Sequence, residues 1–334
     1  MVNEPHHGRT TPLHQPLWHY GGMGLLSALQ GFAVIGIVIA VGYVTARLKI
    51  GGSQAQYVLN RVSFFVSSPC LMFAILAKED LSVLFSPTII VAFASAAIVG
   101  VLFIVLNAVV FKMSAAETTI GALNSLYLNS NNIGLPVATY IVGNPALVAP
   151  ILVMQQALFT PVALTVLDLQ TSGKFSLKRV AAQPLHQPLL IGSLGGILVS
   201  WLSSLYGSFL VPSWIFDPVQ MIGDSAVPLI LMAFGMSLYG TKPLQKGTNV
   251  PAVATVTLLK NVVMPLVAFA LAWGMGFRGA TLYGCVVLAA LPTGQNVYNY
   301  AARYNVGLSF ARDGILFSTL SAPIFISLIA LVFS

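Results

Sequence analysis

The chain has 334 residues, of which 57% are hydrophobic and only 7% are charged, and its mean hydropathy is +0.88. Soluble domains carry about 25% charged residues, so this composition excludes a soluble protein with a single core. The net charge of +7 comes from Lys and Arg residues dispersed over short connections, a pattern that does not indicate a nucleic-acid partner.

The polar segment 1–24 precedes the first apolar run and lacks the basic start and short apolar centre of a cleaved signal peptide. Apolar runs that are long enough to cross a bilayer of ~30 Å then recur to the end of the chain. They predict an all-α integral membrane protein with ten transmembrane helices, at about 25–46, 56–77, 84–111, 118–142, 146–168, 188–207, 213–239, 250–274, 279–302 and 313–333.

Positive charge predicts how these spans are oriented, because Lys and Arg gather in cytoplasmic connections. An even number of spans puts both termini on one side. The connections after odd-numbered spans hold Arg47, Lys49, Lys112, Lys174, Lys178, Arg179, Lys242, Lys246, Arg303 and Arg312. The opposite face, which includes both termini, holds only Arg9, Lys78 and Arg278. We therefore expect a multi-pass protein of the inner or plasma membrane with both termini outside the cytoplasm.

Weak internal similarity divides the spans into two groups of five. Residues 68–73 resemble residues 227–232, and Pro161 and Pro323 occupy equivalent places in the last span of each half. The predicted halves are 25–168 and 188–334, joined by a short cytoplasmic connection at 169–187. Because five is odd, the halves insert with opposite orientations, which makes a 5+5 inverted repeat.

Two helix-breaking segments occupy corresponding places in spans four and nine. Residues 129–136 read Asn-Ser-Asn-Asn-Ile-Gly-Leu-Pro, and residues 289–296 read Ala-Ala-Leu-Pro-Thr-Gly-Gln-Asn. Broken backbone at bilayer depth persists only where protein or a polar cavity surrounds it. A matching pair of breaks is typical of the binding site of a secondary transporter.

The breaks are suited to binding an anion. We expect new half-helices to start near Gly134 and Thr293, with free N–H groups and positive dipole ends at the membrane centre. Proline at 136 and 292 creates these ends, and side-chain donors and acceptors come from Asn129, Asn131, Asn132, Thr293, Gln295 and Asn296. The alternative is that these side chains only satisfy the broken backbone.

Three further polar residues lie within apolar spans. Gln155, beside Gln156 in span five, is either a ligand contact or a bond between helices. Asp224 in span seven is a candidate proton carrier or cation ligand, or else a cap or a partner of Lys260 or Arg61. Lys260 in span eight could pair with an acid, offset the charge of a bound anion, or extend to the membrane surface.

Other features of the sequence are predicted to be structural. Cys70 and Cys285 lie inside apolar spans, where we expect buried free thiols. Asn144-Pro145-Ala146 predicts a tight turn and a helix start, and Glu117 and Asp313 are expected to be solvated or capping residues near span ends. No ATP-binding loop, catalytic nucleophile or set of metal ligands is present in the sequence, so no cofactor, metal or enzyme activity is expected.

The two breaks make the sequence similar to the auxin efflux carrier family from about residue 25 onward. The resemblance rests on Asn129…Gly134-Leu135-Pro136, Met154-Gln155, Ala290-Leu291-Pro292-Thr293-Gly294…Ala301…Tyr304-Asn305-Val306 and Ser318-Thr319-Leu320…Pro323. It implies a scaffold of spans 1, 2, 6 and 7, and a transport domain of spans 3–5 and 8–10 in which the broken helices cross at Pro136 and Pro292. It also implies an organic anion bound beside the crossing by Asn129 and Gln155, a homodimer and an elevator-like motion.

These features predict a secondary transporter of a small organic anion, such as auxin or a dicarboxylate. A sodium-coupled symporter of the bile-acid type has a similar plan but predicts an acidic residue near the second break, and the nearest, Asp313, falls in the following loop. An intramembrane enzyme or receptor is the third, less favoured alternative.

Overall fold

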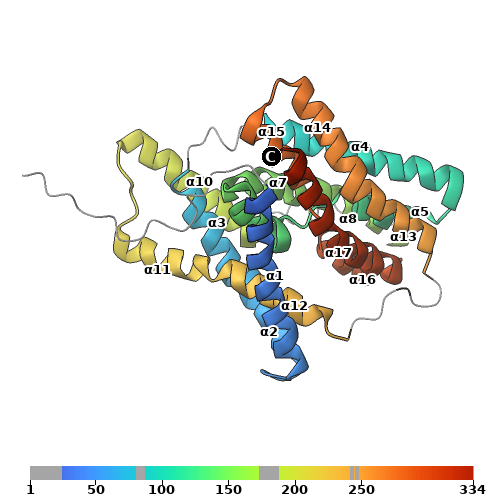
Figure 1. Ribbon diagram of the computed structural model, residues 1–334, viewed down its shortest axis with the longest axis horizontal. Helices are drawn as coiled ribbons and strands as arrows, with labels where there is room; N and C mark the ends of the chain where they lie inside the picture. Colours follow the sequence, from blue (N-terminus) through green and yellow to red (C-terminus); the bar gives the residue numbers. More distant parts are fainter. Residues whose placement is uncertain (1–24, 80–86, 173–187, 241–243, 245–247, 334) are drawn as a thin grey trace, which may run out of the picture.

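The computed structural model describes residues 25–79, 87–172, 188–240, 244 and 248–333 (Figure 1). Within this part of the chain the regular structure is helical and contains no strand beyond one isolated bridge, which confirms the predicted all-α class. The segment 1–24 and most of the connection 169–187 lie outside the described residues, as do Arg9, Lys174, Lys178, Arg179, Lys242 and Lys246.

The helices of the first half follow the apolar runs of the sequence, with short π or 3-10 turns (labelled η) between them. They are α1 (Leu25–Arg47), α2 (Ala55–Val62), η1 (Ser63–Ser67), α3 (Ser68–Leu76), α4 (Thr88–Leu106), η3 (Asn107–Phe111), α5 (Ala115–Leu126), η4 (Ser130–Gly134), α6 (Leu135–Val137), η5 (Ala138–Val142), η6 (Pro145–Leu147), α7 (Val148–Met154), η7 (Gln155–Phe159) and α8 (Thr160–Ser172).

The second half is also built of helices that follow the apolar runs, with a π turn between two of them. Its helices are α10 (Pro188–Tyr206), α11 (Ser213–Asp224), α12 (Ala226–Leu238), α13 (Val250–Leu258), η9 (Leu259–Val263), α14 (Met264–Gly274), α15 (Gly279–Ala289), α16 (Asn296–Tyr304) and α17 (Leu308–Val332). The last helix begins at Leu308, five residues before the predicted start at 313, so Asp313 lies inside a helix and not in a loop.

Seven continuous helical segments of the described chain are long and apolar enough to cross a membrane. They are Ala55–Leu76, Thr88–Phe111, Pro145–Thr171, Pro188–Tyr206, Ser213–Leu238, Val250–Gly274 and Leu308–Val332. Two shorter apolar stretches are also present, Ala33–Arg47 within α1 and Gly279–Ala289. The protein is therefore a multi-pass membrane protein, and the count of ten spans stays a prediction.

Polar side chains determine several helix starts. Ser114 and Glu117 form a reciprocal capping box at the start of α5, in which Ser114 Oγ accepts from the Glu117 amide. Asn144 Oδ1 accepts from the Ala146 amide (3.0 Å) and begins η6, and Asn249 caps α13 in the same way. Capping by Glu117 and the turn at Asn144 are both as predicted.

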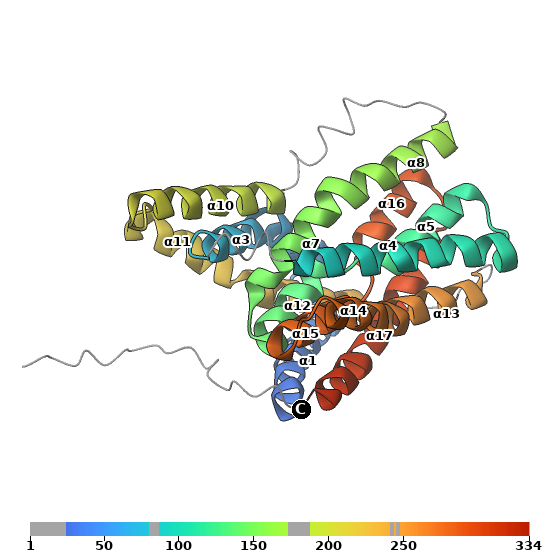
Figure 2. The same ribbon diagram turned by 90° about the horizontal axis from the view of Figure 1, so that it is seen from above.

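The helices form two packed groups that meet at the centre of the molecule. α3 packs against α10 and α11, and α1 packs along α12, while α4 packs against α5 and α14. Figures 1 and 2 both place α3, α10 and α11 on one side and α4, α5 and α13 on the other. Glycine allows the closest approaches, because a Cβ at Gly42 would lie 2.2 Å from the Met232 carbonyl oxygen.

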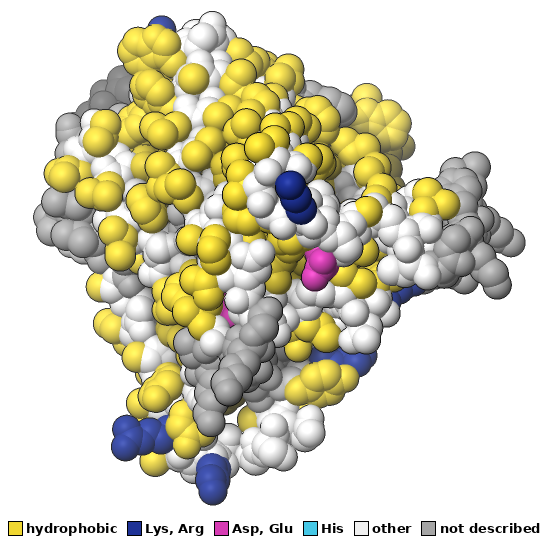
Figure 3. Space-filling view, turned by 90° about the vertical axis from the view of Figure 1, so that its right-hand side faces the viewer, with side chains coloured by type: hydrophobic (Ala, Val, Ile, Leu, Met, Phe, Trp, Pro, Cys, Tyr) yellow, Lys and Arg dark blue, Asp and Glu magenta, His cyan; other side chains and the backbone are white. Residues whose placement is uncertain are grey.

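Apolar side chains cover much of the surface, as a lipid environment requires. Figure 3 shows a face dominated by hydrophobic side chains, with only scattered charges. Examples of exposed apolar side chains are Val109 (70% exposed) and Leu205 (65%). Both cysteines are free, as predicted, but Cys70 and Cys285 are each only partly buried.

Candidate functional site

The two breaks are real interruptions in the helices. α5 ends at Leu126, where the backbone of Tyr127 becomes extended, and helical structure resumes at Ser130. α15 ends at Ala289 and α16 begins at Asn296. The intervening segments, 127–129 and 290–295, are both almost entirely buried, so their backbone groups must find partners within the protein.

The backbone groups of the two segments form hydrogen bonds with each other. Leu128 and Thr293 form an antiparallel bridge. The Asn129 amide donates to the Pro292 carbonyl (2.8 Å), and the Gly294 amide donates to the Tyr127 carbonyl (3.0 Å). A Cβ at Gly294 would lie 3.0 Å from the Leu128 carbonyl oxygen, so glycine at this position allows the close approach.

The Gln155 side chain forms hydrogen bonds with residues of the first break and of the helical turn that follows it. Its Oε1 accepts from the Leu128 amide, and its Nε2 donates to Ser130 Oγ (2.7 Å). The side chain is 1% exposed and belongs to the π turn η7. Both polar ends of Gln155 are thus engaged with backbone or side-chain partners, which is the structural alternative raised for this residue.

Asparagines surround the start of η4. Asn129 Oδ1 accepts from the Asn132 amide (3.2 Å) as an N-cap, while the buried Asn129 Nδ2 has no partner. Asn131 Nδ2 donates to Asn132 Oδ1 (2.9 Å), and Asn131 Oδ1 is buried without a partner. Asn132 Nδ2 donates to Gln295 Oε1 (3.2 Å) and so links the two breaks. The cluster therefore retains one unused donor and one unused acceptor.

Residues of the second break form hydrogen bonds with α5, α17 and Tyr127. The Thr293 amide donates to Ser318 Oγ (3.1 Å), and Thr293 Oγ1 donates to the Asn124 carbonyl. Asn296 Nδ2 donates to the Tyr127 hydroxyl (3.3 Å). The structure thus brings together eight predicted residues, which are Asn129, Asn131, Asn132, Gln155, Pro292, Thr293, Gln295 and Asn296.

A chain of hydroxyl groups beside the cluster is missing from the sequence prediction. The hydroxyls of Tyr127 and Thr160 lie 2.9 Å apart, and those of Thr160 and Tyr300 lie 3.0 Å apart. Tyr127 is 1% exposed. A buried tyrosine usually needs a partner for its hydroxyl. The signal in the sequence is the position of Tyr127 within an apolar span, where its hydroxyl cannot reach water.

The predicted starts of the half-helices need correction. The first begins at Ser130 rather than near Gly134, and the second begins at Asn296 rather than near Thr293. Pro136 lies within the resumed helical run and does not create its end, because the Leu135 amide bonds to the Ser130 carbonyl in a wide π turn that carries the helix past the proline. Pro292, by contrast, lies in the break itself.

Asp224 and Lys260 lie apart from the amide cluster. The Asp224 side chain is exposed at the end of α11. Lys260 is completely buried, and its Nζ donates to Met264 Sδ (3.2 Å). Among the described residues neither pairs with the other or with Arg61, so the predicted alternatives in which Asp224 pairs with one of these cations, or Lys260 reaches the membrane surface, are wrong.

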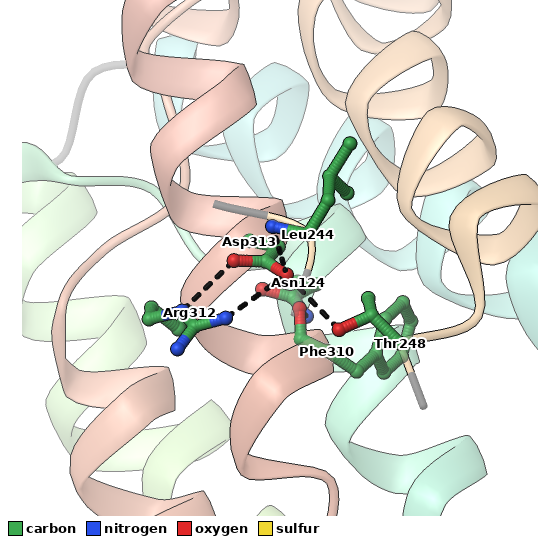
Figure 4. A network of polar contacts seen from close by, with 6 residues as sticks. All are labelled: Asn124, Leu244, Thr248, Phe310, Arg312 and Asp313. Carbon is green, nitrogen blue, oxygen red and sulfur yellow. Dashed lines mark hydrogen bonds and ion pairs between the residues drawn. The ribbon is translucent and has the colours of Figure 1, made fainter. Parts of the chain in front are cut away.

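Asp313 forms a second polar centre (Figure 4). Its carboxylate is 0% exposed and accepts from Arg312 (2.8 Å), the Leu244 amide (3.2 Å) and Thr248 Oγ1 (3.2 Å). The sequence predicts a solvated or capping residue at this position, but the Asp313 side chain is fully buried. The connection that contains Leu244 and Thr248 is thereby tied to α17.

Known proteins resemble this chain over most of its length. The model of a family described as "Membrane transport protein" matches residues 29–179 and 170–330. An "Uncharacterized transporter" of Methanocaldococcus jannaschii is 25% identical over 304 residues, 88% of this chain and 95% of its own length. A protein of Rhizobium meliloti named "Putative malonate transporter" is 24% identical over 292 residues, 85% of this chain and 88% of its own.

These names are names of transporters and not of enzymes. The family matches account for most of the described chain, including both breaks, the span that contains Gln155 and the helix that contains Asp313. They confirm the resemblance that the motifs around the two breaks predicted. The chain belongs to the membrane transport protein family.

Proposed function

We propose that the protein carries a small organic anion with a carboxylate group across the membrane by alternating access. Support comes from the paired breaks, where Asn129 Nδ2 is a buried donor without a partner. An unsatisfied buried donor costs about 1–3 kcal/mol, and a carboxylate oxygen would remove that cost. This single observation carries the proposal.

The helix ends at the crossing support the same ligand. The run that begins at Ser130 and the helix that begins at Asn296 are joined at their starts by the Asn132–Gln295 hydrogen bond. Each start carries N–H groups without intrahelical acceptors and a partial positive charge. Two such ends close together repel one another and favour an anion between them. No fixed positive charge belongs to the cluster, so the bound anion can also be released.

The ten-span inverted repeat, the scaffold and transport domains, the elevator motion and the homodimer belong to this proposal. Packing of α3 with α10 and α11 on one side, and of α4 with α5 and α14 on the other, supports a division into two moving parts. The relative named for malonate supports a carboxylate as the transported group. In this scheme the crossing travels with the transport domain.

Uptake into liposomes tests the proposal. Purified protein should accumulate labelled malonate or another carboxylate, and Asn129→Ala should weaken its apparent affinity about tenfold, the equivalent of one lost hydrogen bond to a charged group. Asn299→Ala, at an exposed asparagine of α16, is the matched control and should transport normally. If a broad panel of carboxylates is not moved at all, the proposal is wrong; unchanged affinity in Asn129→Ala removes that residue from the site.

Sodium coupling is the second candidate, and one observation bears on it. Asp313 lies in α17, and Asn124 joins that helix to the second break, because Asn124 Nδ2 donates to the Phe310 carbonyl (3.5 Å). The helix that contains Asp313 is therefore tied to the second break. The Asp313 oxygens already accept from Arg312, Leu244 and Thr248, which disfavours a cation ligand. Uptake that requires sodium would reverse this preference.

A further inference from the structure

A cavity separate from the amide cluster lies between α4, α7, α14 and α15. Its volume is about 320 Å³, which is in the range of sites for small molecules. The wall is mainly apolar, with Ile89, Leu147, Ile151 and Leu288 among its residues, and no charged side chain lines it. None of the predicted anion contacts at the crossing lines it either, although Leu128 does.

A buried lysine stands directly behind one wall of this cavity. Met264 lines the cavity, and its sulfur accepts a hydrogen bond from Lys260 Nζ at 3.2 Å. Lys260 is 0% exposed, and the described residues supply no carboxylate to pair with it. Ionisable side chains within a membrane are costly and usually functional, and a thioether is a weak acceptor for an ammonium group.

We propose that the cavity is a second anion site, for a ligand with one carboxylate and an apolar chain. The chain fills the cavity, and the carboxylate pairs with Lys260 once the Met264 side chain has turned aside. Methionine is unbranched and has three rotatable bonds, so it can move without displacing the helix. The site goes beyond the proposed transport function, because none of the amide side chains at the two breaks lines it.

The chemistry of the wall selects among anions. A dicarboxylate would bury its second charge in a mainly apolar cavity whose lining contains no cation to pair with it, which is strongly unfavourable. A neutral molecule with the same chain would leave Lys260 without a counter-charge. The ligand could come from the lipid phase as a fatty acid or from water as a shorter monocarboxylate, since both present the same groups.

Binding to the purified full-length protein tests the proposal with decanoate, decanol and malonate as probes. Wild-type protein should bind decanoate at least tenfold more tightly than decanol, and Lys260→Met should remove that preference. Lys78→Met, at an exposed lysine outside the cavity, should retain it, as should Asn129→Ala. A preference for decanoate that survives in Lys260→Met overturns the proposal, and so does equal binding of both probes to wild type.

Cys285 provides a measurement that does not depend on the folding of Lys260→Met. Its side chain lines the cavity and is half-buried, whereas Cys70 does not line it. In Cys70→Ser protein, decanoate should slow the reaction of Cys285 with a maleimide at least tenfold more than decanol does. Protection by octanoate added in water indicates a soluble ligand, and protection only by oleate within nanodisc lipid indicates a lipid ligand; no protection by any of them overturns the site.

The same data separate this inference from the proposed transport function. Malonate uptake that is unaffected by decanoate and by Lys260→Met, together with no decanoate binding, would leave the carrier proposal standing and remove this one. Decanoate binding that depends on Lys260, in a protein that moves no carboxylate, would do the reverse.

Discussion

At the scale of single residues, the two breaks depend on amide side chains that bond to backbone. Gln155 holds the Leu128 amide and Ser130 Oγ at once, while Asn129 caps the resumed helix through Asn132. Such side chains replace the intrahelical bonds that a break removes. Asn129 Nδ2 and Asn131 Oδ1 are left without a partner, so the cluster that supports the breaks also holds the Asn129 donor that we propose binds the ligand.

Gln155→Ala should destabilise the protein, because it leaves the buried Leu128 amide without an acceptor. One unsatisfied buried donor costs about 1–3 kcal/mol, so we expect a lower melting temperature in detergent and a loss of carboxylate uptake. The neighbouring Gln156→Ala is the matched control: Gln156 is also buried, yet its Oε1 has no partner. Equal melting temperatures for the two variants would contradict the role given to Gln155.

At the scale of helices, close packing places glycine where two backbones meet. A Cβ at Gly42 of α1 would lie 2.2 Å from the Met232 carbonyl oxygen, and one at Gly235 of α12 would lie 2.0 Å from the Ile39 carbonyl oxygen. Small residues at such contacts are what allow membrane helices to associate closely. The two glycines face opposite helices, so the contact between α1 and α12 is reciprocal.

Gly42→Ala should therefore separate α1 from α12 and destabilise the protein by about 1–3 kcal/mol, as overpacking does. Gly36→Ala in the same helix is the control, since a Cβ there meets nothing within 4 Å. It should be neutral or stabilising by up to about 1 kcal/mol, because alanine favours the helix. Thermal unfolding of both variants measures the difference. A Gly42→Ala protein as stable as wild type would mean that the contact is loose.

The helix boundaries also explain what the sequence could predict. Apolar length is a local signal, and it predicts most helix ends within a few residues. Pro136 suggests a later helix start than the structure shows, because Asn129, a preferred N-cap residue, begins η4. The burial of Asp313 could not be predicted, because its donors include the Leu244 amide and Thr248, far away in the sequence.

The hydrogen-bond partners of the amide side chains at the two breaks could not be predicted from the sequence either. Residue type and position predicted that Asn129, Thr293 and Gln295 would gather at two breaks. Which of them would bond to backbone, and which would keep an unused atom, depends on an antiparallel register between Leu128 and Thr293. That register joins residues more than 160 positions apart, and no local pattern encodes it.

At the scale of the whole molecule, charge should determine orientation in the membrane. Among the described residues, Arg47 ends α1 and Lys49 follows it, and Lys112 follows η3, while Lys78 and Arg278 belong to the connections predicted for the opposite face. Cytoplasmic connections carry the excess of Lys and Arg. The first three residues should therefore lie in the cytoplasm, and with ten spans both termini should lie outside it.

Reporter fusions check this orientation in whole cells. A C-terminal alkaline phosphatase should be active and a C-terminal green fluorescent protein dark, because the former needs the outer compartment and the latter folds in the cytoplasm. Insertion of either reporter between Gly51 and Gly52, in the exposed turn after α1, should give the opposite result. The same outcome at both positions would contradict the placement of Arg47 and Lys49 opposite the C-terminus. Since α1 through α17 must then cross the membrane an odd number of times, the ten-span inverted repeat would also be wrong.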